Sequence, residues 1–178
     1  STDGLTVMDA VSKIRGPKGT PVSLLILHLN DTKPVAMTII RDTIEIKSVR
    51  LETLPGKIAH ITITSFVEDT DRDLVTVLRQ VRRDSDVGIV LDLRNNPGGL
   101  LDTTVSVASQ FLKDGLVLYE VDSHGQRRDW PVRRGGLVPD TPMVVLVNEF
   151  SASGSEVLTG ALKDHNRATV IGTKTFGK

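Results

Sequence analysis

The strongest constraint on the fold is an alternation of short apolar runs with amphipathic segments between residues 57 and 171. The runs at 57–63, 88–93 and 143–147 are rich in Ile, Val and Leu and have the length of buried strands. The segments between them carry apolar residues every three or four positions, as on one face of a helix. Strand, helix and strand in succession are typical of a mostly parallel sheet covered by helices, so the sequence predicts an α/β fold.

The rest of the chain extends this pattern. Periodicity, turn residues and caps predict helices at 7–15, 69–83, 101–112 and 156–163. The same signals predict strands at 22–29, 35–40, 45–50, 57–63, 88–93, 116–121, 127–132, 143–147 and 168–171. The pattern changes near residues 41–43, so we expect two domains, at 1–42 and 43–178.

Three serines lie where a predicted strand leads into a helix. Ser151, Ser153 and Ser155 follow the apolar run 143–147. A hydroxyl at such a turn is exposed and lies near the free N–H groups of a helix N-terminus, which can stabilise an oxyanion. Glu156 stands three residues after Ser153, however, and this spacing also fits a capping box, in which the serine only caps the helix. The serines alone leave both interpretations open.

A second turn follows the predicted strand 88–93. It reads Asn-Asn-Pro-Gly-Gly at 95–99 and precedes a predicted helix. Two adjacent glycines leave backbone N–H groups unshielded at the end of a core strand, which is the geometry that an oxyanion hole needs. A tight turn without function is the alternative. The segment lacks the Gly-Lys-Ser/Thr ending of a phosphate-binding loop.

Composition narrows the function classes. Lys and Arg number 22 and balance 22 Asp and Glu, so no nucleic-acid partner is indicated. Cysteine is absent, and no cluster of His, Asp and Glu has the spacing of metal ligands, so we expect no metal and no other cofactor. None of the four histidines lies in a motif with an acidic partner, which argues against a Ser-His-Asp triad; they are His28, His60, His124 and His165.

Three motifs, in this order, resemble the carboxy-terminal processing (tail-specific) proteases, which are Ser-Lys peptidases with a PDZ domain. The motifs are Leu-Asp-Leu-Arg-Asn-Asn-Pro-Gly-Gly at 91–99, Ser-Ala-Ser-Gly-Ser-Glu at 151–156 after Asn148, and Gly-Thr-Lys-Thr-Phe-Gly-Lys at 172–178. Residues 4–20 and 39–42 resemble the closing half of the family's PDZ domain. The resemblance implies a crotonase/ClpP-like spiral of ββα units at 43–178, truncated at its C-terminal end, preceded by the C-terminal half of a PDZ-like domain at 1–42.

The resemblance also implies roles for individual residues. By motif position, Ser153 is the nucleophile and Lys178 the general base, and the backbone N–H groups of Gly99 and Gly154 are the oxyanion donors. Gly98 is a less favoured donor than Gly99. The family usually has Ala where this chain has Gly154, but a backbone donor survives that change.

The choice of lysine rests on the same motif. A free lysine is protonated at neutral pH, so it can act as a general base only where its surroundings favour the neutral form. Lys174 is the competing lysine, and Lys178 is preferred because it holds the family's Phe-Gly-Lys position. Family members begin before this segment and continue beyond it, so we expect a longer parent protein. The activity is assigned to that parent and not to residues 1–178 alone.

The implied function is a serine endopeptidase that cleaves near protein C-termini with a Ser-Lys dyad. Its partners would be polypeptide C-termini, with a homo-oligomer or an adaptor protein in addition. Family members are commonly exported to the periplasm, cell envelope or thylakoid lumen. Two other classes stay open: a crotonase-like acyl-CoA enzyme that uses the glycine turn without the dyad, and a catalytically silent peptide-binding module.

Overall fold

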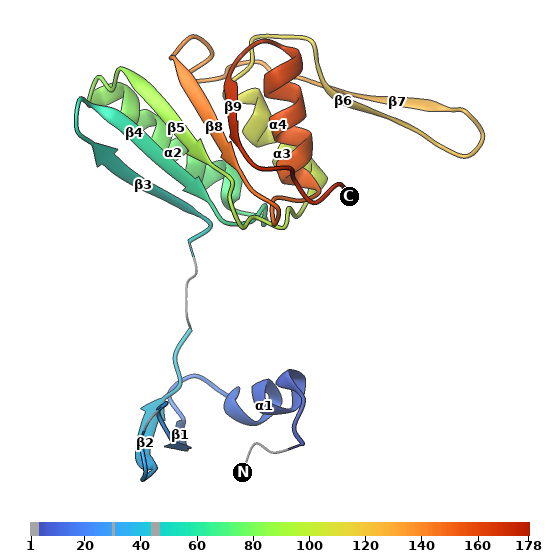
Figure 1. Cartoon of the computed structure of the whole chain (residues 1–178). Coiled ribbons are helices and arrows are strands. Elements are labelled where there is room, and N and C mark those ends of the chain that lie inside the picture. The colour runs from blue at the N-terminus through green and yellow to red at the C-terminus, as the bar shows by residue number, and fades with distance from the viewer. Residues whose placement is uncertain (1–3, 30, 44–46) are drawn as a thin grey trace. The chain divides into compact units, whose positions relative to one another are not determined.

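The computed structural model describes residues 4–29, 31–43 and 47–178 (Figure 1). The chain divides into two compact units, Ser1–Ile46 and Lys47–Lys178. This division lies four residues after the boundary expected from the sequence. The two units are described separately.

Unit 1 consists of one helix and a two-stranded antiparallel sheet. Helix α1 (Val7–Ile14) begins at Thr6, which forms a capping box with Asp9. Strands β1 (Pro21–Ile26) and β2 (Val35–Ile40) pair with each other. Helix and sheet are joined by a hydrogen bond of 2.8 Å from Arg41 Nε to the carbonyl of Ile14.

Unit 2 is built on a five-stranded sheet in the order β3-β4-β5-β8-β9. The strands are β3 (Val49–Leu54), β4 (Ile58–Ile63), β5 (Gly88–Asp92), β8 (Met143–Val147) and β9 (Thr169–Gly172). Strand β3 runs antiparallel to β4, and the other neighbours are parallel. The mostly parallel sheet expected from the alternation of strands and helices is therefore confirmed.

One predicted strand was placed wrongly. The sequence favoured 45–50, whereas β3 covers Val49–Leu54. The reason is pairing: β3 and β4 form a tight hairpin with Val49 opposite Ile63 and Leu54 opposite Ile58. A partner strand that ends at residue 63 therefore sets the register. Residues 44–46 lie outside the described residues.

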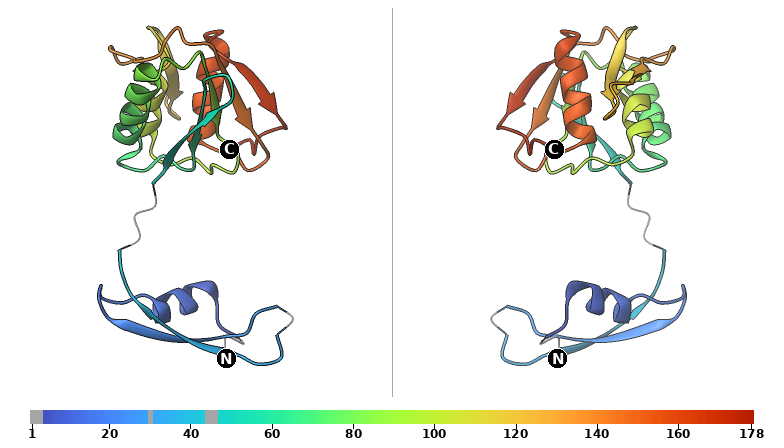
Figure 2. Two further views of the ribbon diagram at one scale, coloured as in Figure 1. Left: turned by 90° about the vertical axis from the view of Figure 1, so that its left-hand side faces the viewer. Right: turned by 90° about the vertical axis from the view of Figure 1, so that its right-hand side faces the viewer.

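Helices α2 (Thr70–Arg83), α3 (Leu101–Ser109) and α4 (Gly154–Asp164) cover one face of this sheet (Figures 1 and 2). Each helix lies in the connection between two parallel neighbours of the sheet, and the connection of α3 also includes β6 and β7. Right-handed crossovers in one direction put all three helices on one side. Helix α2 buries one stripe of side chains against the core, namely Leu74, Leu78 and Val81.

Helix α3 is shorter than the predicted 101–112. After Ser109 the backbone bonds tighten, since the N–H of Gln110 donates to Val107 and the N–H of Phe111 donates to Ala108. These bonds span three residues instead of four, as is common at the end of a helix. Phe111 still packs into the core and is fully buried.

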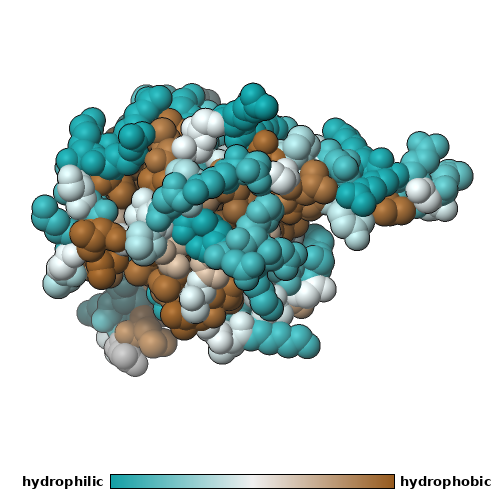
Figure 3. All heavy atoms as spheres, turned by 90° about the horizontal axis from the view of Figure 1, so that it is seen from above, coloured by the Kyte–Doolittle hydropathy of each residue, from teal (hydrophilic) through white to brown (hydrophobic). Residues whose placement is uncertain are grey.

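Strands β6 (Leu116–Val121) and β7 (Arg127–Pro131) form an antiparallel arm that projects from unit 2 (Figure 1). Seen from above, its surface is mainly hydrophilic (Figure 3). Across the arm, the Arg127 guanidinium lies 4.3 Å from the centre of the Tyr119 ring. Within the described ranges, no helix combines the length and apolarity required to cross a membrane.

The position of the candidate site follows from the strand order. Strands β5 and β8 are parallel neighbours, with Asp92 beside Leu146. Their carboxyl ends therefore lie side by side, although about 50 residues of chain separate them. The glycine turn follows β5 and the serine turn follows β8, so the topology brings the two predicted motifs to one edge of the sheet.

Candidate active site

The glycine turn and the serine turn touch each other. A Cβ placed on Gly98 would lie 2.7 Å from Ser153 Cβ and 2.8 Å from the backbone nitrogen of Gly154. Any side chain at residue 98 would therefore collide with the serine turn, and the φ of +97° also favours glycine. The contact brings together the two segments to which the sequence assigned the nucleophile and the oxyanion donors.

Ser153 has a strained backbone. Its φ of 52° and ψ of −116° are unusual for a residue with a side chain. A serine on a strained turn between a strand and a helix projects its hydroxyl outward, as in the nucleophile elbow of α/β-hydrolases. The sequence also allowed a capping role, and Glu156 supplies the acidic half of that box by accepting the Ser153 N–H at 3.0 Å. Ser153 and Glu156 thus have the arrangement of a capping box, but the Ser153 hydroxyl makes no hydrogen bond of ordinary geometry to the start of α4.

The other two serines of the turn have structural partners. Ser151 and Ser155 are fully buried. The Ser151 hydroxyl donates to the carbonyl of Leu93 at 2.8 Å, and the Ser155 hydroxyl donates to the carbonyl of Asn96 at 2.9 Å. Ser153 is half-buried, and its hydroxyl has no hydrogen-bond partner within the described residues. Ser151 and Ser155 therefore stabilise the fold, whereas the hydroxyl of Ser153 is free to react.

The predicted oxyanion donors are the free N–H groups of the two turns. Gly98 donates its N–H to Asn96 Oδ1 at 2.8 Å and is thereby occupied. In the part of the chain that the structure describes, neither the Gly99 N–H nor the Gly154 N–H has a partner. A Cβ on Gly99 would lie 2.1 Å from the carbonyl oxygen of Phe66, so only glycine fits there.

The structure gives a reason for glycine at position 154. A Cβ at this position would lie 2.5 Å from Thr104 Oγ1 and 3.1 Å from Phe66 Cδ2. Thr104 belongs to α3, and its hydroxyl donates to the carbonyl of Leu100 at 3.0 Å. The threonine thus fills the space that an alanine methyl would need.

The two candidate lysines lie in different hollows. Lys178 is exposed and lines a hollow of about 790 Å³, whose walls are Asn95, Pro97, Phe150, Ala152, Phe176 and Lys178. Ala152 directly precedes Ser153, so Lys178 shares a hollow with the serine turn. Lys174 lines another hollow, together with Lys163 and Thr159. This placement favours Lys178 over Lys174, as the motif did.

Glu156 ties the lysine segment to the serine turn. Its Oε2 accepts the backbone N–H of Ser153 and that of Lys178, each at 3.0 Å. Its Oε1 accepts the Thr175 hydroxyl at 2.8 Å and the Gly177 N–H at 2.7 Å. Burial raises the pKa of Glu156, but these four hydrogen bonds outweigh it and hold that pKa below its ordinary value. The spacing of Ser153 and Glu156 in the sequence indicated only a capping contact and gave no sign of the bonds to residues 175–178.

No sequence motif joins a histidine to an acid, but the fold places His60 beside two acidic side chains. His60 Nε2 lies 3.2 Å from Asp92 Oδ2, and His60 Nδ1 lies 3.8 Å from Glu52 Oε2. Burial raises the pKa of Asp92, but hydrogen bonds from Arg94 and His60 bring it below its ordinary value. Within the described residues no serine hydroxyl bonds to His60, so the pair forms no serine triad. Residues 60 and 92 lie on neighbouring parallel strands, a pairing visible only once the strand order is known.

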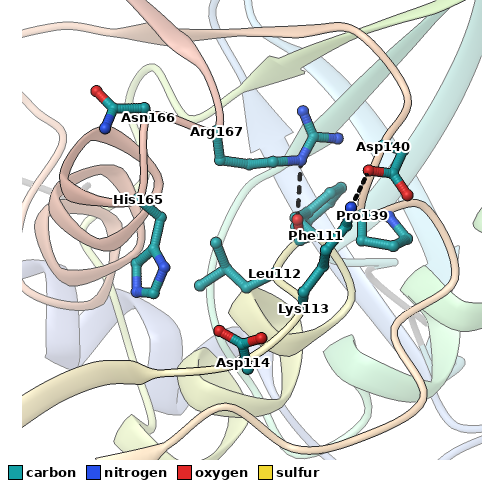
Figure 4. A pocket seen from close by; sticks show the side chains of 9 residues that line it. All are labelled: Phe111, Leu112, Lys113, Asp114, Pro139, Asp140, His165, Asn166 and Arg167. Atoms are coloured by element: carbon teal, nitrogen blue, oxygen red, sulfur yellow. Dashed lines mark hydrogen bonds and ion pairs between the residues drawn. The ribbon is translucent and has the colours of Figure 1, made fainter.

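A hollow at the opposite end of the strands has a structural explanation. It lies at the amino ends of β8 and β9, where Arg167 donates to the carbonyl of Phe111 at 2.8 Å (Figure 4). Arg167 also donates to the carbonyl of Val138 at 2.8 Å. Lys113 pairs with Asp140 at its rim. Both cations are engaged by the protein, and the hollow lies far from the serine turn along both strands. Within the described ranges, no three His, Asp or Glu side chains are arranged to hold a metal ion.

Comparison with known proteins identifies the family of this chain. The model of peptidase family S41 matches residues 57–178. The chain therefore belongs to this peptidase family, which favours a peptidase over the acyl-CoA enzyme that the sequence left open.

Individual relatives show which members of the family this chain is similar to. A carboxy-terminal-processing protease of Bartonella bacilliformis is 40% identical over 98% of this chain and 41% of its own length. A carboxyl-terminal-processing protease of Synechocystis is 37% identical over 99% of this chain and 42% of its own length. Among solved structures, a photosystem II D1 C-terminal processing protease superimposes with a TM-score of 0.70, at 28% identity, over 97% of this chain and 49% of that one. The chain thus spans less than half the length of these relatives.

Proposed function

We propose that the full-length protein is a serine endopeptidase that cleaves polypeptides near their C-termini with Ser153 and Lys178. The observation that carries this proposal is the Ser153 hydroxyl on a strained turn, without a hydrogen-bond partner within the described residues. The turn contacts a glycine turn in which the Gly99 N–H is also unpartnered. An oxyanion between the Gly99 and Gly154 N–H groups would lie at the N-terminus of α4, where the helix dipole favours negative charge.

The proposed reaction proceeds in two stages. Lys178, in its neutral form, takes the proton from Ser153 Oγ, and the oxygen attacks the peptide carbonyl. The tetrahedral oxyanion accepts hydrogen bonds from Gly99 and Gly154. The protonated lysine then gives its proton to the leaving amine, and the C–N bond breaks. A water molecule hydrolyses the resulting ester by the same route, which restores the free serine.

The finer organisation belongs to the same proposal and rests on the resemblance of the three motifs to the carboxy-terminal processing proteases. Unit 1 is proposed to be the C-terminal half of a PDZ-like domain. Unit 2 is proposed to be part of a crotonase/ClpP-like spiral of ββα units. The substrates are proposed to be polypeptide C-termini, with a homo-oligomer or an adaptor as further partners, in the periplasm, the cell envelope or the thylakoid lumen.

The test separates lysine as a base from lysine as a fixed positive charge. Arginine keeps the charge but does not deprotonate at usable pH. We expect Lys178→Arg to lose activity as fully as Lys178→Ala, by about 10²–10⁴-fold in kcat as for the loss of a general base. We also expect the wild-type rate to rise with pH. Cleavage of a peptide is measured for the full-length variants.

Lys174→Ala is the matched control, since Lys174 stands four positions earlier and lines the other hollow. It should cleave at close to the wild-type rate. Substantial cleavage by Lys178→Arg would contradict the Ser-Lys mechanism, and loss of activity in Lys174→Ala alone would move the base to Lys174.

A further inference from the structure

Asn96 is a polar residue enclosed by the candidate site. It lies in the glycine turn between β5 and α3 and is fully buried. Its Nδ2 donates to the carbonyl of Ile63, the last residue of β4, at 2.8 Å. A buried amide with strong partners on several segments holds those segments in one arrangement, because breaking any of these bonds leaves a polar group unpaired.

The side-chain oxygen of Asn96 determines which glycine N–H is free. It accepts the N–H of Gly98 at 2.8 Å, so this donor is turned away from an incoming carbonyl. The next N–H, that of Gly99, has no partner within the described residues. Without the Asn96 side chain, Gly98 would lose this bond, and glycine has the conformational freedom to turn its N–H elsewhere.

The main chain of Asn96 holds the other half of the site. Its carbonyl oxygen accepts the N–H of Ala152 at 3.0 Å and the hydroxyl of Ser155 at 2.9 Å. These two residues flank Ser153 and Gly154. One buried residue therefore contacts both the turn that carries the Gly99 N–H and the turn that carries the Gly154 N–H.

From these contacts we infer that Asn96 is the positioning residue of the oxyanion site. It selects Gly99 over Gly98 as donor and sets the distance between the Gly99 and Gly154 N–H groups. Asn96 does not touch the substrate. The inference rests on the proposed peptidase function and adds to it how the two donors are aligned.

The test uses Asn96→Ala in the full-length protein. Removal of one oxyanion donor lowers kcat by about 10²–10³-fold, so a displaced donor should cost up to this factor. We expect kcat to fall by about 10²-fold while KM for a cleaved peptide stays within about 2-fold, because only the transition state uses the donors. A peptide aldehyde adds to a catalytic serine as a tetrahedral adduct. Its Ki should rise by the same factor as kcat/KM falls.

A binding measurement excludes a general loss of structure. The Kd of an uncleaved peptide is compared between Ser153→Ala and the double variant Ser153→Ala with Asn96→Ala. Equal Kd values are expected, since the ground state does not use the oxyanion donors. A Kd that weakens as much as kcat/KM falls would assign Asn96 to substrate binding or to general structure, and would overturn the inference.

Ser155→Ala and Ser151→Ala form a matched pair in case Asn96→Ala does not fold. Both remove one fully buried hydroxyl that donates to a main-chain carbonyl, but only Ser155 bonds to Asn96. We expect Ser155→Ala to lower kcat by about 3–10-fold, because it removes one of the bonds by which Asn96 aligns the two oxyanion donors. Ser151→Ala should keep the wild-type kcat. Equal kcat values in the two variants would overturn the inference.

The outcomes also separate this inference from the proposed function. A wild-type protein that neither cleaves peptides nor binds the aldehyde overturns the proposed function, and the inference with it. A wild-type protein that does both, with a folded Asn96→Ala that matches it in kcat and aldehyde Ki, overturns only the inference.

Discussion

At the scale of single residues, Ser153 combines a strained backbone with the role of the proposed nucleophile. Its φ of 52° is a conformation that residues with a Cβ rarely adopt. Such strain costs about 1–3 kcal/mol and persists where the surroundings enforce it. Here the enforcing contacts are the Glu156 carboxylate on the Ser153 N–H and the close approach of Gly98 to the Ser153 Cβ.

The strain can be measured by comparing two inactive variants. Ser153→Ala and Ser153→Gly both remove the hydroxyl, but only glycine relaxes the backbone. Glycine should relieve backbone strain of about 1–3 kcal/mol. It also loses more conformational entropy on folding, which costs about 0.5–1 kcal/mol. We therefore expect Ser153→Gly to be more stable than Ser153→Ala by about 1 kcal/mol. Urea unfolding of both variants checks this. A Ser153→Gly protein no more stable than Ser153→Ala would mean that the turn is unstrained.

Gly154 and Thr104 form a second prediction at this scale. Gly154→Ala places a methyl against Thr104 Oγ1 and should cost about 1–3 kcal/mol of stability by overpacking. Thr104→Ala removes the obstacle, so the double variant should recover part of that loss. A double-mutant cycle by urea unfolding should give a coupling of about 0.5–3 kcal/mol. Additive losses would show that the threonine side chain moves aside without cost.

At the scale of elements, two carboxylates help to attach the segment 173–178, beside the backbone hydrogen bond of 3.0 Å from the Phe176 N–H to the carbonyl of Ser151. Glu156 accepts two backbone N–H groups from it, those of Gly177 and Lys178. Glu149 accepts only the hydroxyl of Thr173, at 3.1 Å, and touches neither Ser153 nor Lys178. Glu156 is therefore the residue to test. Glu149, which bonds to the same segment 173–178, is the matched control.

We expect Glu156→Gln to detach the end of this segment and to lower kcat. Glu149→Gln should change neither the attachment of the segment nor kcat. An amide can accept at one oxygen only, so it cannot replace a carboxylate that takes four hydrogen bonds. Hydrogen exchange at the Gly177 and Lys178 amides should speed up in Glu156→Gln. Equal exchange in both variants would show that Glu156 does not hold the segment.

The same carboxylate predicts a pH dependence. Because the folded protein lowers the pKa of Glu156, its ionised form favours folding. This contribution is fully present above the ordinary value of 4.5 and is lost as the pH falls through the lower pKa of the folded state. The stability difference between wild type and Glu156→Gln should therefore shrink below about pH 4.5. Urea unfolding at pH 7 and in acid tests this, and a difference independent of pH would contradict it.

At the scale of the whole molecule, the two units differ in how many apolar side chains they bury. Every buried core side chain within the described residues belongs to unit 2. The side chains of β2 are all exposed, and an isolated two-stranded sheet is only marginally stable. We expect the amides of β1 and β2 to exchange with solvent at least about 10-fold faster than those of β5 and β8, measured by mass spectrometry on this chain. Equal protection would show that unit 1 has a stable core.

Local patterns in the sequence predicted most of the elements of unit 2, because strands and helices leave distinct apolar periodicities. Strand β3 was misplaced because its register depends on β4, a partner that no local pattern reveals. The pair of His60 and Asp92 was missed for the same reason, since neighbouring strands supply its two members. The motifs pointed to Ser153 and Gly99, but only the packed structure shows that Gly98 is occupied by Asn96.

The strand order also governs when the site can exist. A ribosome releases a chain at about 5–20 residues per second, so the stretch from Gly99 to Lys178 takes roughly 4–16 s to emerge. Under the proposed mechanism, a nascent chain therefore has its first oxyanion donor before its nucleophile, and its nucleophile before its base. The proposed Ser-Lys pair cannot form until the chain has passed β9 and Lys178 has emerged.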